Sequence, residues 1–298
     1  MHRKIFWVSS ALIPVDKPII SLYYDRMINR QTSDSPGTNT VAPNLSAEGI
    51  ICGLNTRIMG RQVYCHPVLS STMDEALRLA ESGSPEGTLV TAEAQTKGRG
   101  RLGRAWVSPV GNGMYFSLLL RPAWPATVTP LLTLLSAVAL AETLQDAAGI
   151  DCRIKWPNDI LVNGRKLAGI LLESRVAKEC VEFVILGIGL NIAPLSGELS
   201  STAIGLSEVA VGNCGRSVLL QAFLRVFERR YFSVSDCGWS VVLREWERRS
   251  AVAGCRVSFD SGGKRLTATA LGLADDGGLM LALDDGRVIK RVAGEIYL

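Results

Sequence analysis

The sequence lacks the marks of several common classes of protein. Its seven cysteines include no Cys-x-x-Cys pair, which argues against a disulfide framework or structural zinc and favours a reducing, cytoplasmic location. There is no GxxxxGK(S/T) loop, so a P-loop kinase is excluded. The most apolar run, Leu131 to Ala141, is too short to cross a bilayer, and no signal peptide is evident. Because the net charge of +4 is too small for a dedicated nucleic-acid binder, we expect neither a nucleic acid nor a membrane as a partner.

The residues that are present divide the chain into three parts. Residues 1–43 end in a polar string rich in Ser, Thr, Pro and Gly, which is typical of a poorly ordered extension. Residues 44–253 alternate helical and strand patterns and predict a mixed α and β domain. Residues 254–298 show short alternating strands separated by Gly-rich turns, which predict a small β-barrel. This last part is too short to be an enzyme alone, so we expect the chemistry in residues 44–253.

Capping residues and apolar spacing predict the helices. Ser71 or Thr72 caps a short one, and Thr129 begins the longest one, which we expect to be buried scaffolding. Two further amphipathic helices are predicted over residues 218–231 and 239–246. Their Arg and Glu side chains are expected to face solvent and to carry no chemistry.

Residues 98–106, with the sequence GRGRLGRAW, combine backbone freedom with fixed positive charge. The glycines tolerate positive φ and close approach of a ligand, and the guanidiniums suit carboxylate or phosphate. Similar stretches also occur as solvated surface or in disordered nucleic-acid-binding tails. Strand patterns over residues 89–92 and 114–120 place the loop between two core strands, which favours an anion-binding loop over a disordered tail.

A second constellation has the sequence KWPNDILVNGRKLAGIL and starts at Lys155. Its Asn-Gly pair predicts a type I′ hairpin, and strict alternation after the turn places Lys166, Ala168 and Ile170 on one face. Lys166 could be a solvated strand end, or a cation that neutralises an anionic substrate. Asp159 could likewise be only an Asx-turn former.

The third feature is the apolar strand over residues 184–192, with the sequence VILGIGLNI. Its two glycines leave room for something to lie against the backbone. Taken alone, this GxGxN pattern is weak evidence for a binding site.

In this order, the three segments resemble the biotin protein ligase family, whose hallmarks are GRGRxGRxW, KWPND followed by KLAGIL, and a GIGxN strand. The resemblance begins near Leu45 and continues into the C-terminal strands. It implies an α+β fold with a mixed, largely antiparallel sheet and flanking helices, similar to class II synthetases, plus a small SH3-like barrel. The implied activity is ATP-dependent: biotin is activated as biotinyl-5′-AMP and transferred to a lysine of a biotin carboxyl carrier protein.

The resemblance also implies roles for single residues. The biotin contacts would come from Ser71, Thr72, Met73, Gln95, Arg99, Gly100, Arg101, Lys166, Gly169, Gly187 and Gly189. The ATP contacts would come from Gly98, Arg101, Arg104, Trp106, Lys155, Asn158 and Asn191. In catalysis, Lys166, Arg99 and Arg101 would offset the repulsion between the biotin carboxylate and the α-phosphate, while Mg²⁺ shields the triphosphate. Asp159 would orient or help deprotonate the incoming lysine amine.

Within these roles, hydroxyl and amide groups would hold the ureido ring, and the glycines would admit the flat bicycle. Trp106 would pack near the adenine as the loop closes. The chain departs from the family pattern at Met73, where Asn is common, so a backbone contact is expected there rather than a side-chain contact.

Residues 1–43 contain no helix-turn-helix pattern, so we expect a monofunctional ligase without a repressor function. The alternatives are a lipoate or octanoate ligase of the same fold and a nucleic-acid-binding regulator. The KWPND segment with the full arginine loop argues against the first alternative. The second is supported only by the basic loop and the positive net charge. The sequence leaves open whether the chain forms a homodimer.

Overall fold

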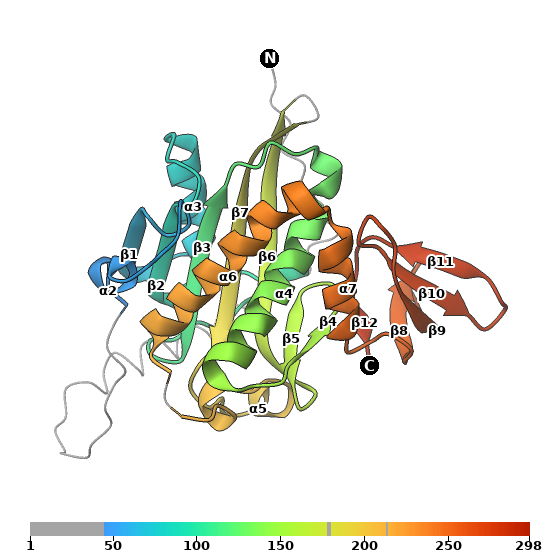
Figure 1. Ribbon diagram of the computed structural model, residues 1–298. Coiled ribbons are helices and arrows are strands. Elements are labelled where there is room, and N and C mark those ends of the chain that lie inside the picture. Colours follow the sequence, from blue (N-terminus) through green and yellow to red (C-terminus); the bar gives the residue numbers. More distant parts are fainter. Residues whose placement is uncertain (1–44, 178–179, 213) are drawn as a thin grey trace.

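The computed structural model describes residues 45–177, 180–212 and 214–298, so the predicted N-terminal extension lies outside the described residues. The main domain is built on a seven-stranded sheet of order β1-β2-β3-β7-β6-β5-β4 (Figure 1). Its strands are β1 (Val63–Leu69), β2 (Leu89–Gln95), β3 (Gly113–Leu120), β4 (Arg153–Lys155), β5 (Asp159–Val162), β6 (Arg165–Ala177) and β7 (Cys180–Asn191). Strands β1 and β2 pair in parallel and all other neighbours pair antiparallel, which confirms the predicted mixed, largely antiparallel sheet.

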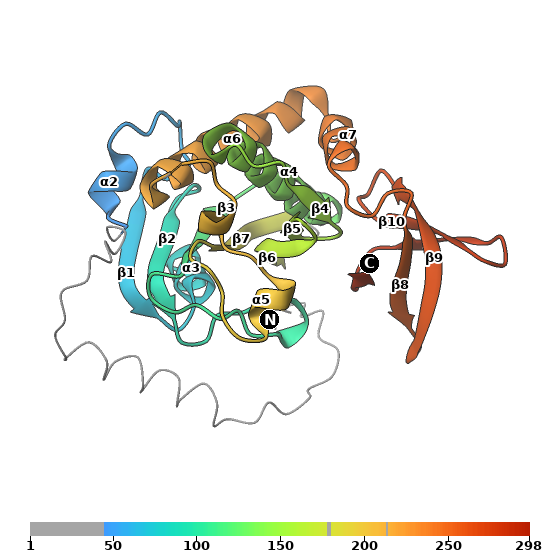
Figure 2. The ribbon, with the colours of Figure 1, turned by 90° about the horizontal axis from the view of Figure 1, so that it is seen from below.

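Helices cover both faces of this sheet (Figure 2). Helices α4 (Thr129–Ala148) and α6 (Arg216–Cys237) pack over one face, and α3 (Thr72–Glu81) packs over the other. The smaller helical elements are α2 (Ala47–Ile51), α5 (Leu199–Thr202), α7 (Ser240–Arg248), η1 (Arg101–Gly103), η2 (Ala126–Val128) and η3 (Leu206–Glu208). Ser71 is the N-cap of α3, and its hydroxyl accepts the Met73 N–H, as the capping pattern predicts.

Helix α4 is the central scaffold. Among the described residues, one helical stretch, residues 126–148, is long and apolar enough to span a membrane by length and composition alone. It extends beyond the run from Leu131 to Ala141 because Thr129 and Pro130 begin the helix and Gly149, with φ of 67°, ends it. Since 72% of its most apolar window is buried inside the fold, its composition fits a core helix.

The expectation that the acidic and basic residues of the later helices face solvent is wrong for α6. Glu228 is buried, and its carboxylate accepts hydrogen bonds of 2.6–2.9 Å from the consecutive backbone N–H groups of residues 57–59. Arg216, the first residue of this helix, is also buried and pairs with Glu93. Buried charge is tolerated here because each group has several partners, and amphipathic spacing cannot reveal such partners.

The C-terminal strands form a second, five-stranded antiparallel sheet of order β11-β10-β9-β8-β12. These strands are β8 (Arg256–Ser261), β9 (Lys264–Leu273), β10 (Leu279–Leu283), β11 (Val288–Arg291) and β12 (Ile296–Tyr297). The predicted small β-domain is confirmed, but strands β11 and β12 end the order, so the pairing among the described residues gives an open sheet rather than a closed barrel.

The small sheet is joined to the main domain through α4. The Trp156 indole donates a 3.1 Å hydrogen bond to the Gly277 carbonyl oxygen. At Gly277, a β-carbon would lie 2.9 Å from Leu131 and from Leu134 of α4, so only glycine fits this turn without displacing the helix side chains. The C-terminal strand is thereby brought to the same end of the molecule as β5 (Figure 1).

Candidate active site

A cavity of about 570 Å³ lies between the glycine-arginine loop (residues 98–106), strands β6 and β7, and the C-terminal residues. Its volume is typical of a small-molecule site. All predicted site residues except Gly98 line it: Ser71, Thr72, Met73, Gln95, Arg99, Gly100, Arg101, Arg104, Trp106, Lys155, Asn158, Asp159, Lys166, Gly169, Gly187, Gly189 and Asn191. The fold therefore gathers residues that are up to 120 positions apart in the sequence, from Ser71 to Asn191, into one site.

One end of the cavity is a buried polar network at the start of α3. The Gln95 amide oxygen accepts the Thr72 N–H at 2.8 Å and lies 3.2 Å from the Thr72 hydroxyl. That hydroxyl also lies 2.8 Å from the Ser117 hydroxyl, and the Gln95 amide NH₂ donates to the Ser108 hydroxyl at 2.9 Å. These side chains are all buried, so their orientations are set by each other rather than by solvent.

The glycines of β6 and β7 make room for two protein side chains. A β-carbon at Gly187 would lie 2.8 Å from the Met73 sulfur. A β-carbon at Gly189 would lie 2.4 Å from the Trp106 indole, and one at Gly169 would lie 2.9 Å from it. Because Gly169 and Gly189 pair across the two strands, the indole lies on a floor of bare backbone and forms a wall of the cavity. The predicted contact of these glycines with a bicyclic ligand stays a prediction.

The glycine-arginine loop uses its glycines in different ways. Only Gly103 has positive φ, at 73°, and its neighbour Leu102 shares this conformation with φ of 57°. At Gly98 a β-carbon would lie 2.4 Å from the Trp106 carbonyl oxygen, so this glycine permits the two ends of the loop to touch. Gly98 thus supports the loop from behind and does not line the cavity.

A β-bulge decides where Lys166 lies. Leu161 pairs with Lys166, but the preceding Ile160 pairs with Ala168, so Leu167 is an extra residue in β6. As a result Ala168 is buried in the core while Lys166 lines the cavity. The prediction that the two share a face is wrong, because strict alternation assumes an unbroken ladder.

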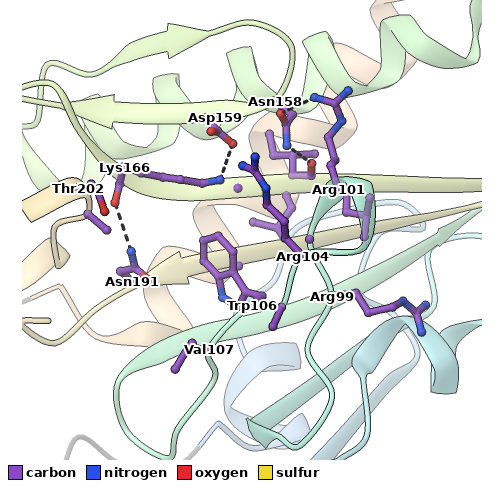
Figure 3. A pocket seen from close by; sticks show the side chains of 18 of the residues that line it. Arg99, Arg101, Arg104, Trp106, Val107, Asn158, Asp159, Lys166, Asn191 and Thr202 are labelled. Carbon is purple, nitrogen blue, oxygen red and sulfur yellow. Dashed lines mark hydrogen bonds and ion pairs between the residues drawn. The ribbon is translucent and has the colours of Figure 1, made fainter. Parts of the chain in front are cut away.

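Lys166 is held by two neighbours inside the cavity. Its ammonium nitrogen lies 2.7 Å from an Asp159 carboxylate oxygen and 5.3 Å from the centre of a Trp106 ring. Figure 3 shows Lys166 and Asp159 pointing toward each other beside the indole. Lys166 is therefore an ordered cation within the site and not a solvated strand end, and Asp159 is its ion-pair partner.

Two of the loop arginines are already paired with acids. Arg99 pairs with Asp74 and, at 3.3 Å, with Glu173; burial disfavours its charge, but these carboxylates raise its pKa above the ordinary value. It points away from the Lys166 cluster (Figure 3). Arg104 forms a bidentate ion pair with Glu295. In this structure acidic partners thus already neutralise the charge of both guanidiniums.

Arg101 and Lys155 form no ion pair with any of the described residues. The Arg101 guanidinium donates to neutral oxygens, the Asn158 side-chain carbonyl at 3.1 Å and the Gly294 backbone carbonyl at 3.2 Å. Burial lowers its pKa from the ordinary value, so the charged form would gain from an anion. Lys155 has no ion-pair partner within the part of the chain that the structure describes.

The two predicted asparagines serve the architecture of the site. The Asn158 amide donates to the Ile170 carbonyl oxygen at 2.8 Å while its own oxygen accepts from Arg101. The Asn191 amide donates to the Lys166 backbone carbonyl oxygen at 3.3 Å. Both side chains thus connect strands beneath the cavity, and their predicted contact with a nucleotide stays a prediction.

Sequence reasoning missed the contribution of the last residues. Glu295, Tyr297 and Leu298 line the cavity, and the Tyr297 hydroxyl lies 3.0 Å from the Glu295 carboxylate. No motif marks these positions, and only the packing of the small sheet against α4 brings them to the site. Five residues that follow β7 also line the cavity: Leu195, Leu199, Ser201, Thr202 and Ala203. Among the described residues, no group of three His, Cys, Asp or Glu side chains could hold a metal ion.

Comparison with known proteins gives one consistent family. The model of the biotin/lipoate A/B protein ligase family matches residues 65–191. The bifunctional ligase/repressor BirA of Bacillus subtilis is 41% identical over 252 residues, which cover 83% of this chain and 77% of that protein. The biotin–(acetyl-CoA-carboxylase) ligase of Paracoccus denitrificans is 37% identical over 227 residues, covering 74% and 93% of the two chains. The solved biotin protein ligase of Aquifex aeolicus in complex with biotin and ATP matches with a TM-score of 0.68 and 27% identity, over 79% of this chain and 97% of that one.

Proposed function

The chain belongs to the biotin/lipoate A/B protein ligase family, and from this premise we propose the reaction of the cavity. The protein is an ATP-dependent biotin protein ligase: it forms biotinyl-5′-AMP and transfers the biotinyl group to a lysine of a carrier protein. The observation that carries this function is the convergence of Lys166, Arg101 and Lys155 in one cavity with the buried polar network around Gln95.

The first half-reaction brings two anions together. A biotin carboxylate oxygen attacks the α-phosphorus of ATP, the bond to the β-phosphate oxygen breaks, and pyrophosphate leaves. Fixed cations must offset this repulsion. Among the described residues Arg101 and Lys155 form no ion pair, and the Lys166 ammonium, 2.7 Å from Asp159, supplies a third positive group in the cavity.

The second half-reaction needs a neutral amine. The lysine amine of the acceptor attacks the acyl carbon, AMP leaves, and one proton must be removed from the amine nitrogen. Asp159 lies on the cavity wall and can orient the amine or accept this proton. We propose that Lys166, its ion-pair partner, keeps this carboxylate in place.

The polar end of the cavity explains a preference for biotin. A ureido ring presents two N–H donors and one carbonyl acceptor, and the hydroxyls of Ser71 and Thr72 with the Gln95 amide provide complementary groups. A lipoyl ring or an octanoyl chain has neither ureido N–H donors nor a ureido carbonyl, so it would form none of these hydrogen bonds in the polar end of the cavity.

Mg²⁺ would accompany the nucleotide. Since the described residues provide no cluster of three metal-ligating side chains, the ion would be held mainly by oxygen atoms of the triphosphate. When bound, it would neutralise phosphate charge.

The acceptor is a biotin carboxyl carrier protein or domain, as the names of the relatives imply. We propose that residues 44–253 form the ligase domain and that residues 254–298 complete its cavity. A cytoplasmic location is supported by the seven cysteines, all of which are free. Homodimer formation is a further proposal, which the exposed edge strand β1 supports and sedimentation would test.

Exchange of labelled pyrophosphate into ATP tests the function, because it reports the first half-reaction without needing the correct acceptor. We expect exchange that depends on biotin, and none with lipoate or octanoate. Equal exchange with lipoate would overturn the substrate assignment, and no exchange with any of the three acids would overturn the proposed reaction.

A further inference from the structure

Ser108 does not line the cavity. It contacts both Gln95 of the buried polar network and Trp106 of the glycine-arginine loop. It follows the glycine-arginine loop in the sequence and is 3% exposed. Its backbone oxygen accepts the Gln95 N–H at 3.0 Å, which attaches the segment after the loop to the end of β2. The backbone of Ser108 is therefore held in a fixed position relative to the main sheet.

The Ser108 hydroxyl connects the polar network to the loop. It donates to the Trp106 carbonyl oxygen at 3.0 Å and accepts the Gln95 amide NH₂ at 2.9 Å. A hydroxyl has one proton, and the carbonyl can only accept, so the hydroxyl oxygen remains free to accept from Gln95. This arrangement turns the Gln95 amide oxygen toward the Thr72 N–H, 2.8 Å away.

The same hydroxyl lies where the two ends of the loop meet. The Trp106 N–H donates to the Gly98 carbonyl oxygen at 2.9 Å. At Gly98 a β-carbon would lie 2.8 Å from the Ser108 hydroxyl oxygen and 3.1 Å from the Gln95 amide nitrogen. Because the atoms are closely packed at this point, a movement of the Gln95 amide must displace the residues at the base of the loop. A movement of the base of the loop must likewise displace the Gln95 amide.

We propose that Ser108 is a positioning residue that couples recognition of the biotin ring at Gln95 to the placement of the glycine-arginine loop and the Trp106 indole. This inference rests on the proposed ligase function. In the coupled site, filling the ring pocket favours the loop position that retains the acyl-adenylate. Without the hydroxyl, ring binding and loop closure become separate events.

The test compares three variants of the full chain. Ser108→Ala removes the hydroxyl, Ser108→Thr retains it, and Ser136→Ala is a matched control. The control removes another buried serine hydroxyl that donates to a backbone carbonyl, 2.6 Å from Leu132 oxygen in α4, away from the cavity. The measurements are the biotin KM and kcat in pyrophosphate exchange, thermal unfolding, and the ratio of biotin on a bystander protein, serum albumin, to biotin on the acceptor.

We expect Ser108→Ala to raise the biotin KM by about tenfold, the range that one or two neutral hydrogen bonds give, and to raise the bystander ratio by a similar factor. Ser108→Thr should restore both values, and Ser136→Ala should change neither while lowering thermal stability. A structural role alone would move only the unfolding temperature. If Ser108→Ala fails to fold, Ser108→Cys, which is close in size but hydrogen-bonds weakly, takes its place with the same expectations.

The outcomes distinguish the coupling role of Ser108 from the ligase function on which it rests. Suppose that the unaltered chain catalyses exchange and that Ser108→Ala has an unchanged biotin KM and an unchanged bystander ratio. This result would overturn the coupling and would leave the proposed ligase function intact. A rise in KM without a rise in the bystander ratio would also overturn it, because Ser108 would then serve ring binding only. Absence of exchange in the unaltered chain would overturn the ligase function and the inference with it.

Discussion

At the scale of single residues, the cations of the site differ in whether an acidic side chain already forms an ion pair with them. Of five cations on the cavity wall, Arg99, Arg104 and Lys166 have acidic partners. Arg101 and Lys155 have none among the described residues. Arginines of the same motif are thus not equally able to bind a substrate anion. The difference comes from acidic side chains that other elements place beside them.

Lys166→Ala should lose most adenylate formation and keep the fold. In the proposed reaction the ammonium offsets charge on the reacting anions, so its loss should lower kcat for pyrophosphate exchange about a hundredfold, or ~3 kcal/mol. Arg165→Ala is the matched control, since it removes the neighbouring cation, which lies 3.6 Å from Glu208. Kinetics of exchange and thermal unfolding measure both effects. Normal turnover with only a raised biotin KM would show that Lys166 binds without catalysing.

At the scale of elements, the side chains of the glycine-arginine loop attach it to the C-terminal residues. Its short 3-10 turn, η1, includes a leucine with positive φ, a conformation that a non-glycine residue adopts at a cost of order 1 kcal/mol. Arg101 and Arg104 connect it to Gly294 and Glu295. A loop held in this way can change position when its side-chain contacts are exchanged for ligand contacts.

Arg101→Gly should slow adenylation without abolishing it, and should let the acyl-adenylate that forms escape. The variant loses the bonds to Asn158 and Gly294, and the added glycine raises the entropy cost of ordering the loop by about 0.5–1 kcal/mol. Released intermediate reacts with any exposed lysine, so albumin in the assay should become biotinylated while acceptor labelling slows. Arg101→Ala, which loses the contacts only, should show a smaller leak. Strict acceptor specificity, with full retention of intermediate in a filter-binding assay, would mean that Arg101 takes no part in closure.

At the scale of the whole molecule, the cavity is complete only when the small sheet is docked. Its C-terminal residues line the site, and the indole of Trp156, the tryptophan of the KWPND segment, donates a hydrogen bond to the Gly277 carbonyl oxygen of the small sheet. Core residues of both sheets belong to one hydrophobic cluster. The C-terminal domain is therefore part of the site and not an appendage to it.

Glu295→Gln should weaken the hold of the small sheet on the loop. The Arg104–Glu295 pair is partly exposed, and such pairs contribute about 0.2–1 kcal/mol, so retention of the intermediate should fall by a factor of about 1.4 to 5 at low salt. Asp284→Asn is the control, because it breaks a comparable pair with Arg256 elsewhere in the same sheet. Filter binding at two salt concentrations measures the effect. Equal retention in both variants would show that this pair does not hold the loop.

The sequence by itself determined the local features and the membership of the site. Asn163 and Gly164 have φ of 51° and 76°, the type I′ turn that an Asn-Gly pair predicts. The preference of serine for helix N-caps predicts the Ser71 cap. The Gly-rich turns of residues 254–298 predict the small β-domain. Nearly all predicted site residues line one cavity, and their individual roles there stay predictions.

Only the tertiary structure decided how those residues are used. The bulge at Leu167 turns Lys166 into the cavity, the partners of Arg99 come from α3 and β6, and Glu295 comes from the far end of the chain. A bulge is selected by the packing of both faces of a sheet, and an ion pair by which charges the fold brings within reach. Both depend on contacts between segments distant in sequence, so no local pattern contains them.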